Sequence, residues 1–149
     1  MKKIVLLICF VISYFVSNGQ SMKKPTINHI AIYVADINSS ISFYRNIIGL
    51  DTIPEPFRDG KHAWFAIGPG ISMHVIEGAG TKKEYYKNNH ICFSVGSVET
   101  FTTQLRKNNI SWEDRDGLKM SVTTRVDGVK QVWLQDPDGY WVEINDAKD

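Results

Sequence analysis

The sequence has few cysteines and little net charge, and each shortage excludes a class of protein. Cysteine occurs twice in 149 residues. Cys9 lies in an apolar run that we expect to be removed, so Cys92 would remain alone and no intramolecular disulfide could form. The formal net charge is +1, and no long run carries one sign. This argues against nucleic acid or an acidic membrane as the main partner, because both require clustered charge.

Long apolar runs are absent except at the N-terminus. Lys2 and Lys3 precede the apolar residues 4–16, and small residues follow at 17–19. This order is typical of a secretory signal peptide, and the run is shorter than the roughly 20 residues of a membrane-spanning helix. We predict a signal peptide at 1–19 and a flexible lead-in at 20–25. The mature protein is then expected to be exported, periplasmic or secreted, without membrane contact after cleavage.

A short strand-like segment occurs twice. Residues 28–34 read Asn-His-Ile-Ala-Ile-Tyr-Val, and residues 89–95 read Asn-His-Ile-Cys-Phe-Ser-Val. Each copy precedes a helix-capping residue, Asp36 or Asn38 in the first and Ser97 in the second, and then an amphipathic segment. Asp36 and Ser97 are 61 positions apart, as are the two histidines. The chain therefore reads as one unit made twice.

The remaining segments complete a β-α-β-β-β unit in each copy. His74 and Glu143, on the last strands, are 69 positions apart. The second copy thus has eight extra residues, which we place in a turn-rich excursion at 114–130; such loops often line sites. The predicted strands lie at 27–35, 51–57, 62–67 and 71–77, and then at 89–95, 110–115, 129–135 and 140–145.

We therefore predict an α+β protein whose two tandem βαβββ modules form one curved, cup-shaped mixed sheet, because neither module alone can bury a core. The single domain spans 26–146. It divides into module one at 26–77, a linker at 78–88 and module two at 89–146, and a tail follows at 147–149.

Four residues occupy equivalent places in the two copies. His29 and His90 open the first strands, whereas His74 and Glu143 lie within the last strands, each between apolar neighbours. A buried carboxylate is costly unless it is paired or bound to a cation. Imidazole with carboxylate suits a divalent transition metal. Singly, each residue is better explained as an ordinary polar side chain; together they predict a metal centre. His62 has Thr123 at the assumed counterpart position and is predicted to be surface.

The mature chain resembles the vicinal oxygen chelate superfamily, which includes glyoxalase I, extradiol dioxygenases, fosfomycin-modifying thiol transferases and methylmalonyl-CoA epimerase. The resemblance implies paired βαβββ modules that form an open cup around one divalent metal. It also implies a homodimer, because in small members two chains often contribute to each metal. The matching segments are Asn28-His29-Ile30-Ala31, the stretch 42–50, Asn89-His90-Ile91 and Asp136-Pro137-Asp138-Gly139-Tyr140, which leads into Val142-Glu143-Ile144.

The implied ligands are His29, His74, His90 and Glu143, with zinc or nickel as the favoured metal and iron or manganese as alternatives. The implied activity is that of a glyoxalase I-like lyase or isomerase, acting on a small substrate that chelates the metal through adjacent oxygens. Bacterial glyoxalase I usually has Glu where this chain has His74, so Glu143 would be the catalytic residue that moves the proton alone.

Two other functions stay open at this point. One is an extradiol-type iron dioxygenase, and the other is a non-enzymatic, antibiotic-sequestering protein like the bleomycin-resistance proteins. The substrate itself is not identified by the sequence. The residues singled out as a wall for a substrate pocket are Trp64, Trp112, Arg125 and Trp133.

Overall fold

The computed structural model describes residues 23–148. The predicted signal peptide at 1–19 lies outside this range. Within it, no helix combines the length and the apolar character needed to cross a membrane.

The first half of the chain is built from four strands and one helical segment. Helix α1 begins after Asp36, whose carboxylate accepts hydrogen bonds from the backbone N–H groups of Asn38 and Ser39. The helical segment ends at Gly49, which adopts a φ of 90°. Its elements are β1 (His29–Val34), α1 (Ile37–Ser42), the π-helical continuation η1 (Phe43–Ile48), β2 (Thr52–Ile53), β3 (His62–Gly68) and β4 (Ile71–Glu77).

The second half repeats this order. Ser97 caps helix α2 by accepting a hydrogen bond from the backbone N–H of Thr100. The apolar side of α2, with Val98, Phe101 and Leu105, is buried. Its elements are β5 (His90–Ser94), α2 (Val98–Lys107), β6 (Thr123–Thr124), β7 (Lys130–Gln135) and β8 (Trp141–Asn145).

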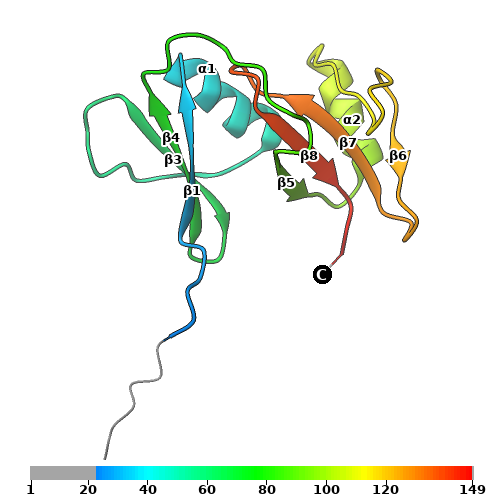
Figure 1. Ribbon diagram of the computed structural model, residues 1–149, viewed down its shortest axis with the longest axis horizontal. Coiled ribbons are helices and arrows are strands. Elements are labelled where there is room, and N and C mark those ends of the chain that lie inside the picture. The colour runs from blue at the N-terminus through cyan, green and yellow to red at the C-terminus, as the bar shows by residue number, and fades with distance from the viewer. Residues whose placement is uncertain (1–22, 149) are drawn as a thin grey trace, which may run out of the picture.

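Each half forms its own four-stranded mixed sheet, in the order β1-β4-β3-β2 and β5-β8-β7-β6. The first strand of each half runs parallel to the last, and the other pairs are antiparallel. Figure 1 shows the two sheets side by side, with β1 and β8 near the middle. The predicted α+β class, with two tandem βαβββ modules in an open cup, is confirmed. The prediction of one continuous sheet is wrong, because each module forms a separate sheet.

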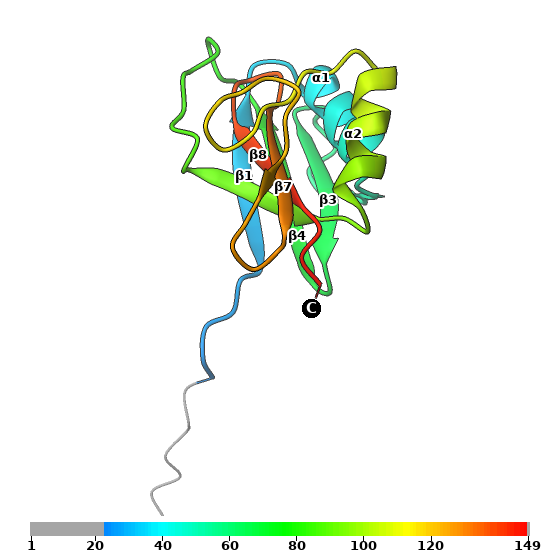
Figure 2. The same cartoon turned by 90° about the vertical axis from the view of Figure 1, so that its right-hand side faces the viewer.

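Both helices cover the same side of the two sheets (Figure 2). On β4, Met73 and Val75 are fully buried beneath this layer, and on β8 the same is true of Val142 and Ile144. These residues belong to one apolar core that includes side chains from both halves. Because side chains alternate along a strand, His74 and Glu143 point to the opposite face of their sheets.

The turn Asp136–Tyr140, here called the latch turn, joins the two halves. The Asp138 carboxylate accepts a hydrogen bond of 2.7 Å from the backbone N–H of Ala35. The Tyr44 hydroxyl donates to Asp136 at 2.9 Å, although burial raises the pKa of that carboxyl. The Tyr140 hydroxyl lies 3.2 Å from both the backbone N–H and the carbonyl oxygen of Tyr33. The most specific motif of the sequence is therefore a contact between modules.

Two predicted strands are wrong in extent. The strand predicted at 51–57 is reduced to Thr52–Ile53, because Pro54 and Pro56 have no N–H to donate to a sheet. The strand predicted at 110–115 is replaced by isolated bridges from Glu113 to Lys119 and Trp133. There the chain turns back at Asp114, whose side chain accepts two backbone hydrogen bonds.

Candidate metal centre

His74 and Glu143 occupy the same position in the two sheets. In the first, His74 lies between Ala31 of β1 and Trp64 of β3. In the second, Glu143 lies between Cys92 of β5 and Trp133 of β7. Both are only 7% exposed. The duplication seen in the sequence thus extends to the residues on either side of each predicted ligand.

In module one the structure brings His29 and His74 together. Their ring centroids are 6.3 Å apart, and the Trp64 indole stacks on His74 at 4.0 Å with an interplanar angle of 12°. Burial lowers the pKa of His74, and the neighbouring His62 and His29 lower it further. The imidazole of His74 is therefore kept neutral, which is the form that binds a metal.

In module two the structure pairs His90 with Glu143. The Nε2 atom of His90 lies 2.9 Å from Oε2 of Glu143, and its Nδ1 lies 2.8 Å from the carbonyl oxygen of Lys87. A carbonyl oxygen only accepts hydrogen bonds, so Nδ1 must carry a hydrogen. Nε2 then faces a carboxylate oxygen, and that contact is favourable only with a proton or a metal cation between the two atoms.

The donors of this pair fit a divalent metal. Two ligands about 2.1 Å from one cation and at right angles to each other lie about 3.0 Å apart, close to the 2.9 Å observed. The second oxygen of Glu143 accepts a hydrogen bond of 3.2 Å from the Asn145 amide. The carbonyl of Lys87 therefore orients the His90 ring, and the amide of Asn145 orients the Glu143 carboxylate, as hydrogen-bonding groups usually do around metal ligands.

The two pairs do not converge within one chain. Over residues 23–148 no three His, Cys, Asp or Glu side chains are grouped so that they could hold a metal. The edge strands β1 and β5 line a cavity of about 260 Å³, whose walls include His90, Tyr140 and Trp141. The four predicted ligands thus form two half-sites, and their union in one centre stays a prediction.

His62 was predicted to be surface, and this was wrong. It is half-buried, and its Nδ1 lies 2.7 Å from Nε2 of His74. The prediction compared His62 with Thr123, but the register of β3 and β7 makes Gln131 its counterpart. The eight extra residues precede β7, so an offset of 69 rather than 61 applies and would have identified this position from the sequence.

The residues suggested for a substrate pocket fall into two groups. Trp64 and Trp133 are equivalent cross-strand neighbours of His74 and Glu143, and Trp133 meets His90 edge-on at 6.2 Å. Trp112 is buried in the core, and Arg125 forms an ion pair with Asp127 at 2.6 Å. Of these four residues, Trp64 and Trp133 lie nearest the half-sites.

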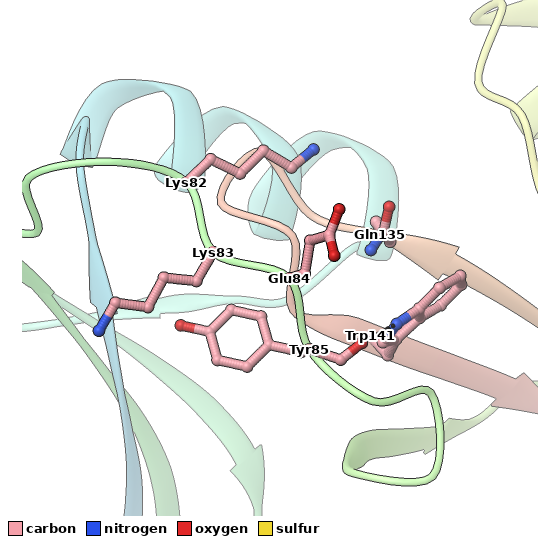
Figure 3. Close-up of a pocket in the computed structure, with 6 residues that line it drawn as sticks. All are labelled: Lys82, Lys83, Glu84, Tyr85, Gln135 and Trp141. Atoms are coloured by element: carbon pink, nitrogen blue, oxygen red, sulfur yellow. Dashed lines mark hydrogen bonds between the residues drawn. The ribbon is translucent and has the colours of Figure 1, made fainter.

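A second cavity, of about 550 Å³, lies beneath the segment that joins the modules. It is bounded by Lys82, Lys83, Glu84, Tyr85, Gln135 and Trp141 (Figure 3). The Trp141 indole donates a hydrogen bond to the Tyr85 carbonyl at 2.9 Å. Because Trp141 is the register partner of His90, this cavity lies beside the module-two half-site. Lys82 and Lys83 point away from each other in Figure 3 and do not form an anion clamp.

Cys92 has no features of a reactive thiol. Its sulfur accepts a contact from the Asn145 amide at 3.1 Å. Partial burial raises the pKa of Cys92 to about 12, and the neighbouring Glu143 carboxylate raises it as well. The thiolate is therefore scarce at neutral pH.

Two mixed sheets with imidazole and carboxylate donors at duplicated positions define a tandem βαβββ cup. The chain belongs to the Glyoxalase/Bleomycin resistance protein/Dioxygenase superfamily, whose family model matches residues 26–144. The family predicted from the sequence motifs is thereby confirmed.

The relatives include several kinds of enzyme. The lactoylglutathione lyase of Salmonella typhimurium (strain LT2) is 28% identical over 129 residues, which cover 81% of this chain and 92% of the relative. The metallothiol transferase FosB of Staphylococcus haemolyticus is 29% identical over 126 residues, covering 80% and 81%. Among solved structures, the oxidase ChaP-H1 superposes with a TM-score of 0.66 at 25% identity, covering 83% of this chain and 97% of that one.

Proposed function

We propose that this protein is a divalent-metal-dependent enzyme that isomerises or cleaves a small substrate with two adjacent oxygens. The proposal rests mainly on the pair formed by His90 and Glu143, whose 2.9 Å separation and orienting partners suit metal coordination. The match to a superfamily that contains a metallothiol transferase and a lactoylglutathione lyase supports it.

The proposed ligands are His29 and His74 from module one and His90 and Glu143 from module two. Nitrogen and oxygen donors of this kind suit zinc or nickel, and also iron or manganese. When bound, the ion would polarise the substrate oxygens as a Lewis acid. Four protein ligands would leave about two positions of an octahedron for a substrate that binds through two oxygens.

Glu143 is the proposed proton carrier. Its carboxylate is 7% exposed and is held by His90 and Asn145. In an isomerisation it would take a proton from one carbon and return it to the adjacent carbon, so no further reactant is consumed. His74 is held neutral by burial and is positioned to bind rather than to carry this proton.

We also propose that the working form is a homodimer. The two half-sites lie in different modules, and no three donor side chains meet among the described residues of one chain. Module one of one copy and module two of another could complete the ligand set. The N-terminal sequence leads us to propose further that the enzyme acts outside the cytoplasm.

An iron-dependent oxygenase is the second candidate. The structural similarity to the oxidase ChaP-H1 favours it. The ligand chemistry also suits it, since His29, His90 and Glu143 would supply the two histidines and one carboxylate that bind iron in non-haem iron enzymes. Its substrate would be a catechol-like compound, and it would consume oxygen.

Metal analysis followed by a substrate screen tests the proposal. We expect the purified protein to retain a divalent metal. His90→Ala or Glu143→Ala should lower metal affinity by at least about tenfold. Glu99→Ala is the matched control, because this exposed carboxylate contacts Lys130 and Ser97 and none of the proposed ligands. The substrates are α-ketoaldehydes, hemithioacetals and, with an oxygen electrode, catechols.

Each outcome separates the candidates. Metal binding with proton exchange on a ketoaldehyde or hemithioacetal supports the lyase or isomerase, and oxygen uptake with iron supports the oxygenase. A protein that binds none of the four metals, or binds them equally well after Glu143→Ala, would rule out the proposed centre.

A further inference from the structure

We propose that His62 and His74 form a two-imidazole site in module one that binds a late divalent transition metal without help from module two. His62 thus becomes a metal-binding residue in addition to the four proposed ligands. The inference rests on the proposed function only in sharing His74 with it. The carrying observation is the 2.7 Å distance between Nδ1 of His62 and Nε2 of His74.

This distance is close to that of two nitrogens bound to one cation. Ligand nitrogens about 2.1 Å from zinc lie about 3.0 Å apart at right angles and about 3.4 Å apart in a tetrahedron. In the metal-free chain one of the two nitrogens carries a hydrogen that it donates to the other. When a metal binds, this hydrogen moves to the other nitrogen of the same ring, so that both facing nitrogens present lone pairs, and the rings need to separate by only a few tenths of an ångström.

The surroundings of His62 favour the form that binds metal. Its Nε2 lies 3.5 Å from Oδ2 of Asp59, and the negative charge of this carboxylate favours the tautomer with hydrogen on Nε2 and a lone pair on Nδ1. A carboxylate behind a ligating imidazole fixes its tautomer and makes it a better donor. The Phe57 ring stacks on His74 at a centroid distance of 5.8 Å and lies tilted against His62 at 4.4 Å.

The duplication provides an internal comparison. The position equivalent to His62 in module two is Gln131, and the position equivalent to His74 is Glu143. Module one therefore carries two imidazoles where module two carries an amide and a carboxylate. Imidazole donors favour late metals such as nickel, copper and zinc, so module one is the half that should capture these ions. His62→Gln converts module one to the arrangement of module two at this position.

The experiment uses the full chain carrying His90→Ala and Glu143→Ala, stripped of metal with a chelator. Zinc is titrated by calorimetry, and cobalt(II) binding is followed by visible absorption. We expect the double variant to keep one zinc site. Addition of His62→Gln should weaken zinc binding by at least about tenfold and change the cobalt spectrum. Lys61→Gln, at the exposed neighbouring position, should change neither. Circular dichroism confirms that each variant is folded.

The outcomes distinguish this inference from the proposed function. If the double variant binds no zinc, or binds it as well after His62→Gln, the His62–His74 site is overturned and the proposed four-ligand centre is unaffected. If the unsubstituted chain and the double variant bind zinc equally, and both depend on His62, this site stands and the proposed centre fails.

Discussion

Among single residues, His74 and Glu143 show how one scaffold position can present different chemistry. Each is almost buried and has a tryptophan as its antiparallel neighbour. Burial lowers the pKa of His74, whereas Glu143 is held by His90 and Asn145. Strand alternation was enough to predict which face these residues occupy. Their partners depend on strand pairing, so the sequence could not reveal them.

Gly139, in the latch turn, is a residue whose lack of a side chain is required. It adopts a φ of +94°, and a Cβ atom there would lie 2.6 Å from the Lys83 carbonyl oxygen. We expect Gly139→Ala to lower the free energy of unfolding by about 2–4 kcal/mol, because it adds backbone strain and a backbone clash. Urea unfolding followed by circular dichroism measures this.

Gly128→Ala is the control for backbone strain alone. Gly128 has a φ of +86°, but a Cβ atom would meet nothing within 4 Å. We expect a cost of about 1–2 kcal/mol from the left-handed conformation. If both variants lose the same free energy of unfolding, the close approach of residues 82–83 to the latch turn does not contribute to the effect of Gly139→Ala.

At the level of elements, the long loop of module two, residues 114–130, is held in place by the buried carboxylate of Glu113. Glu113 is 8% exposed and pairs with both Lys87 and Lys119. The Lys87 ammonium also donates to the carbonyl of Asp114 at 3.0 Å, and the Lys87 carbonyl lies 2.8 Å from His90. The excursion is thereby linked to the His90 half-site through a single lysine.

Glu113→Gln tests this link through its pH dependence. Burial alone would raise the pKa of Glu113, but hydrogen bonds from Lys119 and Lys87 outweigh it and lower the pKa below 4.5. The carboxylate thus stabilises the fold above pH 4.5, and this contribution disappears as the pH falls through the lowered pKa. We expect the variant to be about 1–3 kcal/mol less stable at neutral pH.

The difference from the unsubstituted protein should shrink in acid, as measured by urea unfolding at several pH values. Glu99→Gln is the control, and it should matter far less because Glu99 and Lys130 are both exposed. A gap between Glu113→Gln and the unsubstituted protein that stays constant into acid would show that charge is not the cause.

Elements with long internal patterns were predicted well, and elements that depend on remote contacts were not. The strand at 71–77 and the caps Asp36 and Ser97 agree with the structure, because alternation and capping are local. The excursion contains the short strand β6, and its path follows from the side chains of Glu113 and Asp114 rather than from any periodicity.

For the whole molecule, the central feature is that every strand pair of residues 23–148 lies within one module. The donors are divided in the same way, with His29 and His74 in one half and His90 and Glu143 in the other. If a metal is shared between two copies, each dimer contains two centres, and each centre draws one half-site from each chain.

A mixing experiment tests this sharing. Chains carrying His74→Ala and chains carrying Glu143→Ala should each lack an intact shared centre. After joint unfolding and refolding, mixed dimers should regain one intact centre, since both substitutions can fall in the same site. Cobalt(II) absorption of the mixture measures the recovery. If the cobalt(II) absorption of the mixture only equals the average of the two separate variants, each centre lies within a single chain.

The shortness of β2 and β6 has a consequence for behaviour in solution. An exposed outer strand offers free N–H and C=O groups to any passing chain and so invites aggregation. At one edge of each sheet, β2 and β6 consist of Thr52–Ile53 and Thr123–Thr124, and the prolines that shorten β2 also interrupt its hydrogen-bonding edge. The opposite edges, β1 and β5, flank the cavity between the modules. The edges formed by β2 and β6 therefore offer little backbone with which another chain could pair.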